Sequence, residues 1–331
     1  MAASARFYHI GFGRDDLGAD PPQIALLSGD PERARMIAQT QLGNVRALSE
    51  HRGLNSYVGV LPGGRPILSA TSGMGAPSLS IVVNELIQVG IRQIIRVGTC
   101  GSIQAHVLPG SVVISRAALC RQGAANDIAP TEYPAAADPF LTVALVEAAR
   151  ALNVDHHMGI TASVDTFYEG QERSESANPR LLRWLQGITE EYRGLNVLNY
   201  EMEAGTLFKM AGVYGFAAAC ICGVIAQRTS GENIVLTQKN TAVDSAIAGR
   251  PDDPAAGVVR QPVTRPALDS DGERLLHHLL GEVEVTEDPD EGRDRPPRLL
   301  LEQAADDLLR RYCGRASAFP RLVCSSEPTA S

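Results

Sequence analysis

Two segments place glycine and arginine where a strand is expected to end, a combination that suits an anion. In Gly29–Arg33 the glycine lets the backbone approach a ligand, and the N–H groups of a following helix favour negative charge. Arg33 would add a forked charge partner, although a capped helix with a surface arginine is the alternative interpretation. Arg96–Gly101 brings an arginine, two glycines and Thr99 to the end of another strand, where α/β sheets bind ligands. Neither segment carries a dinucleotide fingerprint or a triphosphate loop, so a single phosphate fits best.

A third segment, Asp165–Arg173, combines an aromatic pair with a glutamine and an arginine. Phe167 offers a stacking face, and the amide of Gln171 can meet both a carbonyl and an N–H of a pyrimidine edge. Arg173 adds a planar set of donors. The segment therefore fits recognition of a flat heterocycle, or else it is a polar surface loop anchored by two core aromatic residues.

Two carboxylates, Glu201 and Glu203, stand two residues apart where a strand is expected to pass into a helix. In an extended segment this spacing puts both on one side, where they could bind the vicinal hydroxyls of a sugar. Glu203 could instead be a favourable charge in the first turn of the helix.

The elements that must position these residues alternate along the chain. Helices 31–39 and 139–152 follow Asp-Pro steps and helix 179–191 an Asn-Pro step, each supplying a capping side chain and a proline for the first turn. Further helices are predicted at 77–89 and 203–214, and strands at 24–28, 57–61, 66–70, 93–97, 111–115, 157–163 and 216–226. This alternation predicts an α/β fold, a three-layer α/β/α single domain with a central mixed sheet, over residues 1–249.

The character of the sequence changes after Gly249. Residues 250–297 are rich in Pro, Asp, Arg and Gly, as in a linker or an insert without fixed structure. Within 299–312, apolar residues recur every fourth position, which favours an amphipathic helix. We therefore expect a catalytic domain at 1–249 and a largely unstructured extension at 250–331.

Composition excludes several classes of protein. The chain has 331 residues, 44% of them hydrophobic, and a net charge of −8, which disfavours a broad nucleic-acid interface. Its longest apolar run, 216–226, is too short to cross a bilayer, and residues 1–13 show no apolar signal region, so we expect a cytoplasmic protein. The six cysteines form no CxxC pair and no zinc spacing with histidine, so neither a metal site nor a disulfide framework is expected.

The order and spacing of these segments resemble the nucleoside phosphorylase family over about residues 7–248. GDPxR, RxGTxG and EME are similar to the whole family, whereas FYxGQER and the GVIxxRT of residues 223–229 resemble its uridine-cleaving branch. The purine branch carries an aspartate in a Ser-Asp pair after its corresponding late strand. Here that strand runs into Ile225–Arg228, and this acid is absent.

The resemblance implies a role for each matching residue. The phosphate ligands would be Gly29, Arg33, Arg52, Arg96 and Thr99; the ribose ligands His9, Glu201, Met202 and Glu203; and the base ligands Phe167, Gln171, Arg173, Ile225 and Arg228. Among them Arg96, Gln171, Arg173 and Glu203 would carry catalysis.

The implied reaction is the conversion of uridine and inorganic phosphate to uracil and ribose 1-phosphate, without a cofactor. His9 and Arg52 would act across the interface of a homo-oligomer, a dimer or a hexamer. Gly53 stands where relatives often carry a glutamate that helps to hold a monovalent cation, so this cation site is not expected.

Three rival interpretations remain at this point. The first is a phosphorylase or nucleosidase of the same fold that acts on purine or methylthio nucleosides. The second is a non-catalytic nucleoside-binding protein, which the complete set of phosphate ligands disfavours. The third is a dinucleotide-dependent oxidoreductase, which the missing fingerprint disfavours.

Overall fold

In the part of the chain that the structure describes, ten strands form one mixed sheet, and half of these strands close into a barrel. The computed structural model describes residues 6–61, 64–229 and 233–234, all within one compact unit. The strands are β1 (Ile24–Ser28), β2 (Gly43–Ser49), β3 (Ser56–Val60), β4 (Pro66–Thr71), β5 (Gln93–Ser102), β6 (Val112–Arg121), β7 (His156–Val164), β8 (Val197–Glu201), β9 (Ala217–Gln227) and β10 (Asn233–Ile234). The extension at 250–331 and the helix at 299–312 lie outside the described residues.

The closed part is a five-stranded barrel of β5, β9, β6, β7 and β8. β5 pairs with β9 in parallel and with β8 in antiparallel orientation, which joins the two ends of the series. Four outer strands, β1, β4, β3 and β2, continue from β5. The α/β class and the mixed sheet are thus confirmed. The prediction of three layers missed the closure of five strands into a barrel.

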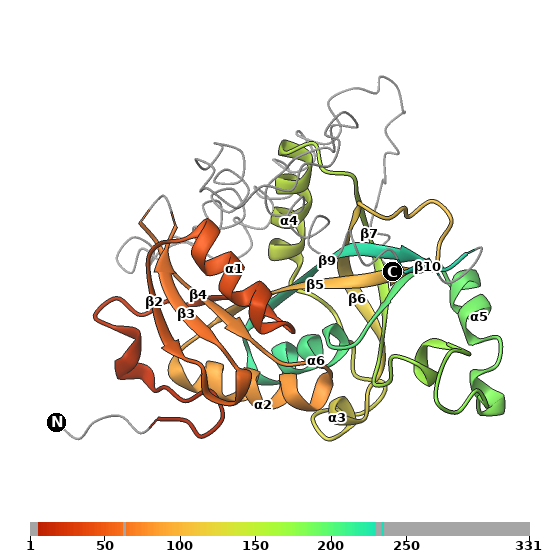
Figure 1. Cartoon of the computed structure of the whole chain (residues 1–331), viewed down its shortest axis with the longest axis horizontal. Helices are drawn as coiled ribbons and strands as arrows, with labels where there is room; N and C mark the ends of the chain where they lie inside the picture. The colour runs from red at the N-terminus through yellow and green to blue at the C-terminus, as the bar shows by residue number, and fades with distance from the viewer. Residues whose placement is uncertain (1–5, 62–63, 230–232, 235–331) are drawn as a thin grey trace, which may run out of the picture. The chain divides into compact units, whose positions relative to one another are not determined.

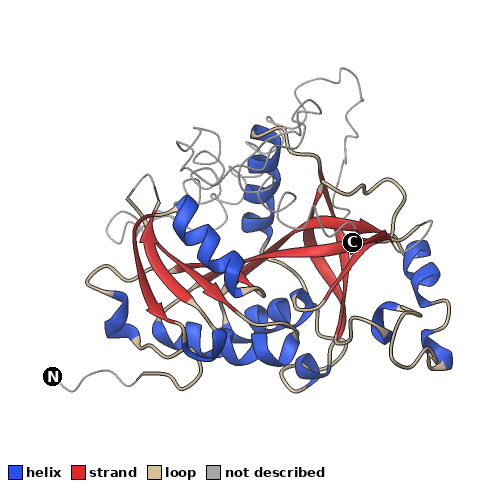
Figure 2. Ribbon diagram, in the orientation of Figure 1, coloured by secondary structure: helices blue, strands red, loops and turns tan. Residues whose placement is uncertain are grey.

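Helices cover both faces of the sheet. They are α1 (Pro31–Gln41), α2 (Ala76–Val89), α3 (Gly123–Asn126), α4 (Pro139–Ala151), α5 (Ile188–Gly194) and α6 (Ala204–Tyr214). In Figure 1, α1 and α4 lie above the strands and α2, α3 and α6 below them, with α5 at the far end of the barrel. Figure 2 shows the strands as a continuous layer between these helices. None of the described helices is long and apolar enough to cross a membrane.

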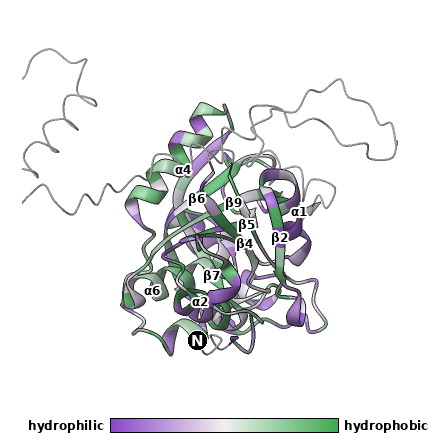
Figure 3. Cartoon of the chain, turned by 90° about the vertical axis from the view of Figure 1, so that its left-hand side faces the viewer, coloured by the Kyte–Doolittle hydropathy of each residue, from purple (hydrophilic) through white to green (hydrophobic). Residues whose placement is uncertain are grey.

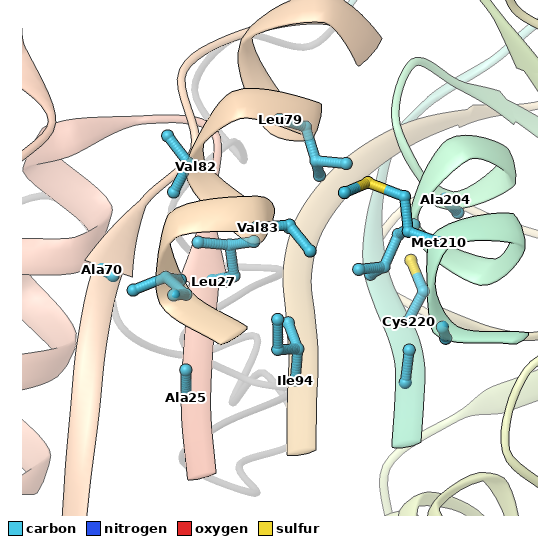
Figure 4. Packing of buried hydrophobic residues seen from close by; sticks show 14 of the residues in the cluster. Ala25, Leu27, Ala70, Leu79, Val82, Val83, Ile94, Ala204, Met210 and Cys220 are labelled. Carbon is cyan, nitrogen blue, oxygen red and sulfur yellow. The ribbon is translucent and has the colours of Figure 1, made fainter. Parts of the chain in front are cut away.

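The alternation of side chains along the strands explains the two cores. On β1, Ala25 and Leu27 face α2, whereas Ile24 and Leu26 face the core beneath α1. Figure 4 shows the first core, in which side chains of α2 and α6 pack on β1, β4, β5 and β9. The central strands are mainly hydrophobic and α1 is largely hydrophilic (Figure 3). The central parallel strands, such as β1 and β5, are therefore buried on both sides, as parallel strands require.

Capping at Asp-Pro steps sets the start of two helices as predicted. Asp30 accepts a hydrogen bond from the N–H of Glu32 at 3.0 Å, and Asp138 accepts one from the N–H of Leu141 at 2.9 Å. Prolines occupy the first turn of both α1 and α4.

The predicted helix 179–191 is wrong. Its region forms a single 3₁₀ turn, Arg183–Leu185, and the helix α5 begins only at Ile188. Gly187 separates the two with a φ of 82°, a left-handed conformation that ends a helical path. The sequence prediction also missed the edge strand β2, whose exposed residues carry no clear apolar alternation.

Candidate active site

A cavity of about 510 Å³ opens where the strands β1, β5 and β9 end. These strands run parallel, so their carboxyl ends meet at one edge of the sheet. The cavity brings together eleven of the fourteen residues predicted for the site. They are Gly29, Arg33, Arg96, Thr99, Phe167, Gln171, Arg173, Glu201, Met202, Glu203 and Ile225. The sequence therefore located the cavity, although the role of each residue stays a prediction.

The centre of the cavity is a buried arginine between two carboxylates. Arg96 is 4% exposed, and its Nε donates to Oε2 of Glu201 at 3.2 Å. Its Nη2 donates to Oε2 of Glu203, whose other oxygen accepts the N–H of Gly75 at 2.6 Å. Nη1 is buried and has no hydrogen-bond partner among the described residues. One donor of this guanidinium is thus available to a ligand.

The three charges determine one another's protonation. Burial opposes the charge of Arg96, but Glu203 and Glu201 outweigh it and hold the pKa of Arg96 above its ordinary range. Burial raises the pKa of Glu201 to about 7, with Arg96 lowering it and Glu203 raising it. Arg96 therefore keeps its charge, and Glu201 ionises near neutral pH.

Two glycines make room for this arrangement. A Cβ on Gly98 would lie 2.9 Å from the Sγ of Cys222 and 3.1 Å from Nη2 of Arg96. A Cβ on Gly29 would lie 3.3 Å from the carbonyl oxygen of Gly73 and 3.9 Å from Nη1 of Arg96. The predicted close approach of the backbone at Gly29 is thus present, and it faces the available donor.

The start of α6 is saturated by side chains. Oε2 of Glu201 accepts the N–H groups of Glu203 and Ala204, both at 2.8 Å. Oγ of Ser163 accepts the N–H of residue 205, and Oε1 of Gln122 accepts that of residue 206, again at 2.8 Å. All four N–H groups at this helix start therefore have partners, which an α-helix cannot provide internally.

The same cavity is lined by Phe167, Gln171 and Arg173, the set that the sequence predicts to recognise a flat ring. Gln171 and Arg173 are 3% and 4% exposed, whereas Phe167 and Tyr168 are 40% and 48% exposed. The alternative of a polar loop anchored by two core aromatic residues is therefore wrong, because the polar side chains point inward. The guanidinium of Arg173 lies 4.1 Å from the centre of the Phe167 ring, which fixes the plane of both.

Arg33 also lies inside, not on the surface. It is 7% exposed and lines the cavity beside Gly29 and Thr99. The interpretation of Gly29–Arg33 as a capped helix with a surface arginine is thus incomplete: the helix is capped, but the arginine is buried.

His9 and Arg52 lie away from this cavity, in a cluster of their own. Nη1 of Arg52 donates to the Tyr8 hydroxyl at 3.2 Å, and the Tyr8 and His9 rings meet edge to face at 5.0 Å. Nδ1 of His9 lies 2.6 Å from Oε1 of Glu85, so this nitrogen carries the proton and donates. One chain does not bring these two residues to the other eleven.

Arg228 is the remaining predicted residue, and it lines a neighbouring cavity of about 330 Å³. It is 9% exposed, its guanidinium lies 5.4 Å from the centre of the Tyr200 ring, and its Nη2 donates to the carbonyl of Glu172 at 3.5 Å. A Cβ on Gly101 would lie 3.5 Å from its Cδ and 3.9 Å from the guanidinium of Arg173. Arg228 thus lies just behind the wall of the cavity.

Sequence reasoning missed several residues of the site. Met74 is 85% exposed at the mouth, and Gly75 holds Glu203 through its N–H. The signal for both was the glycine-rich turn 72–75 ahead of a helix. Gln122 and Ser163 gave no signal, because their contacts join segments far apart in the sequence.

Three cysteines of the barrel, Cys100, Cys220 and Cys222, are buried, whereas Cys120 is partly exposed. Cys220 and Cys222 lie on one face of β9 with their Sγ atoms 3.6 Å apart. Within the described ranges, no group of three or more His, Cys, Asp or Glu residues could hold a metal ion.

The comparison with known protein families identifies the phosphorylase superfamily. The model of this family matches residues 23–248, and the chain belongs to it. The uridine phosphorylase of Salmonella typhimurium is 42% identical over 226 residues, which cover 68% of this chain and 87% of the relative. The uridine phosphorylase of Thermococcus kodakarensis is 38% identical over 225 residues, covering 68% and 79%. A DeoD-type purine nucleoside phosphorylase of Photorhabdus laumondii is 35% identical over 231 residues, covering 69% and 90%.

Proposed function

We propose that this chain is a uridine phosphorylase, which converts uridine and phosphate to uracil and α-D-ribose 1-phosphate. The observation that carries the proposal is the buried pair Gln171 and Arg173 in one cavity with the buried arginines Arg33 and Arg96. The cavity thus pairs a reader for a polar ring edge with a cationic site for an anion. The identity to relatives named uridine phosphorylase supports this choice of base.

In this proposal phosphate lies between Arg33, Arg96 and the backbone near Gly29 and Thr99. Two guanidinium groups hold it in line with the anomeric carbon, and this positioning supplies much of the rate. The bond to the base lengthens first, and the sugar becomes oxocarbenium-like, as in glycoside cleavage generally. The phosphate oxygen then forms the new bond and stabilises the positive charge as it approaches.

The ribose would lie over Glu201, Met202 and Glu203, with Glu203 accepting hydrogen bonds from its hydroxyls. Glu203 now accepts from Arg96, so a bound phosphate would draw the guanidinium away and free this carboxylate. Phosphate would thereby prepare the ribose site. This coupling predicts that phosphate raises the affinity for the nucleoside.

The leaving uracil would gain negative charge on its carbonyl oxygens and on the ring nitrogen that was bonded to the sugar. Gln171 and Arg173 donate to it from positions that are already fixed by burial and by the Phe167 ring. Donors that are fixed before the reaction stabilise developing charge without reorganisation. Ile225 would close the pocket, and Arg228 would support Arg173 from behind.

His9 and Arg52 would complete the site of a second copy of the chain. They share one cluster through Tyr8, outside the cavity of their own chain. A homo-oligomer would carry an additional cation to the phosphate and a histidine to the 5′-hydroxyl. The Nε2 atom of His9 suits this role, because Nδ1 is bound to Glu85 and the side chain is 32% exposed.

A purine nucleoside phosphorylase is the second candidate, because a relative so named is 35% identical. The two are separated by a substrate panel in phosphate buffer: uridine, cytidine, inosine and adenosine at equal concentration, with the released bases measured by chromatography. Uridine should be cleaved at least a hundredfold faster than the purine nucleosides. Equal or faster cleavage of inosine or adenosine would refute the uridine assignment.

A further inference from the structure

Two buried polar side chains outside the proposed ligand set hold the segment that would carry the ribose. Gln122 follows β6 and is 1% exposed, and Ser163 lies near the end of β7 and is fully buried. Neither lines the cavity. Both contact residues 201–206, more than 35 positions further along the chain, and Ser163 is the strand partner of Glu201 in the pairing of β7 with β8.

Gln122 connects the two halves of the strand-to-helix turn. Its Nε2 donates to the carbonyl of Met202, and its Oε1 accepts the N–H and the hydroxyl of Thr206, each at 2.8 Å. The backbone donor fixes the orientation of the amide, since a flipped amide would set two donors against each other. The carbonyl of Met202, which lies between Glu201 and Glu203, is thereby tied to the first turn of α6.

Ser163 acts on the same turn through the neighbouring carboxylate. Its hydroxyl donates to Oε1 of Glu201 and accepts the N–H of Gly205 at 2.8 Å. Oε2 of Glu201 is occupied by Arg96 and by the backbone N–H groups of residues 203 and 204. Each of the two oxygens therefore has a fixed partner, and the carboxylate cannot rotate without breaking bonds in the interior.

We propose that Gln122 and Ser163 are positioning residues for the ribose-binding segment Glu201–Glu203. The inference rests on the proposed function only in that this segment would hold a ribose. Gln122 sets the path of the backbone between the two glutamates, and Ser163 sets the rotamer of Glu201. Displacing a binding group by about 1 Å can cost a hundredfold in rate, so these contacts matter although they touch no substrate.

Two substitutions of Gln122 separate positioning from mere stability. Gln122→Met keeps the length of the side chain and removes all three of these hydrogen bonds. Gln122→Glu keeps the acceptor for Thr206, where negative charge suits a helix start, and replaces the donor that faces Met202 by an acceptor. At pH 8 both variants should lose roughly ten- to a hundredfold in kcat/KM for the nucleoside, with a much smaller change in KM for phosphate.

The matched control is Thr206→Val, which removes the hydroxyl bond to Gln122 and keeps the bond from the backbone N–H of residue 206. It should lower the unfolding temperature as Gln122→Met does and leave kcat/KM within about twofold of the wild type. A loss in Thr206→Val as large as that in Gln122→Met would show a purely structural role and overturn the proposal. So would values within twofold of the wild type for both Gln122 variants.

Ser163→Ala adds a measurement that a change in helix stability would not affect, the pH dependence of kcat/KM. The substitution removes a donor to Glu201, whose carboxylate is also faced by Arg96, Glu203 and Cys222, all unchanged. Losing that donor raises the pKa of Glu201, so the acid limb of the kcat/KM–pH profile should move to higher pH. An unchanged limb together with unchanged kcat/KM would overturn the role of Ser163.

A failure of the proposed function itself would be recognised separately, because the wild-type protein would then not cleave uridine. The variants are then assayed with the purine or methylthio nucleoside that the wild type cleaves, because residues 201–203 would serve the ribose that these substrates share. The comparison between each variant and the wild type tests the positioning role in either case.

Discussion

Replacing Arg96 by methionine should destabilise the protein in a manner that depends on pH. Methionine approximates the volume of the arginine stem but leaves the carboxylates of Glu201 and Glu203 without their cation. These side chains are 0% and 5% exposed, so water cannot replace the arginine. Breaking a buried ion pair from one side typically costs about 3–5 kcal/mol, because an uncompensated charge stays inside.

The size of the loss should depend on the charge of Glu201. Its pKa is about 7 in the folded protein and 4.5 in the unfolded chain, and Arg96 lowers the folded value. Without Arg96 the folded protein holds this proton to still higher pH. The free energy of unfolding should therefore fall with the same slope in both proteins from pH 4.5 to about 7, and it should go on falling in the variant above pH 7, where the wild type levels off; each unit of additional pKa shift contributes about 1.4 kcal/mol.

Urea unfolding of both proteins at pH 5 and pH 8 measures this difference. We expect the free energy of unfolding of the variant to be lower than that of the wild type by about 3–5 kcal/mol at pH 8, and by clearly less at pH 5. Adding Glu203→Gln to Arg96→Met should restore part of the loss, and the surface control Arg35→Met should cost less than about 1 kcal/mol. A gap below about 1 kcal/mol at pH 8, or an equal gap at both pH values, would refute this reasoning.

Four further predictions follow from the site. Gln171→Ala should reduce uridine turnover and narrow the preference for uridine over cytidine. In the wild type, two buried mismatches of about 1–3 kcal/mol each set this preference at roughly a hundredfold. Competition kinetics measure the ratio of the two kcat/KM values, and an unchanged ratio would exclude Gln171 as the residue that recognises the base. Glu201→Gln should flatten the decline of stability between pH 4.5 and 7, because ionisation of the buried carboxyl opposes folding there; an unaltered curve from thermal unfolding would contradict this. Co-expressed Arg52→Ala and Gln171→Ala chains should regain activity that neither homo-oligomer shows, since a mixed dimer rebuilds one intact site; activity no higher than the sum of the two parents would place Arg52 in its own chain's site. A chain ending at Gly249 should keep kcat/KM, as all described site residues precede this position; an inactive truncation would contradict it.

The sequence predicted the residues that line the cavity better than it predicted the closure of the barrel. Gly29, Arg96 and Glu203 were recognisable because glycine, charge and strand ends coincide along the chain, and short-range patterns reveal such coincidences. The pairing of β5 with both β8 and β9 joins segments about a hundred residues apart, so no local pattern reports it. The predicted three layers are consequently correct for the outer strands and incomplete for the barrel.

The inward direction of Gln171 and Arg173 could not be derived from residue types either. Hydrophobicity alone favours a buried Phe167 and exposed Gln171 and Arg173. In the structure Phe167 is partly exposed, and Gln171 and Arg173 are buried. The burial of polar groups without a local reason is a mark of a binding site, where stability yields to function. Gln122 and Ser163 remained invisible for a related reason, because a single buried glutamine or serine has meaning only through its distant partners.

The most direct test of phosphorolysis is the dependence of uridine cleavage on phosphate. The protein is incubated with uridine in phosphate buffer and in a phosphate-free buffer of equal ionic strength, and uracil, ribose and ribose 1-phosphate are quantified. We expect uracil and ribose 1-phosphate in equal amounts with phosphate, and no uracil above background without it. Equal release of uracil in both buffers, accompanied by free ribose, would contradict the phosphorylase assignment and show a nucleosidase.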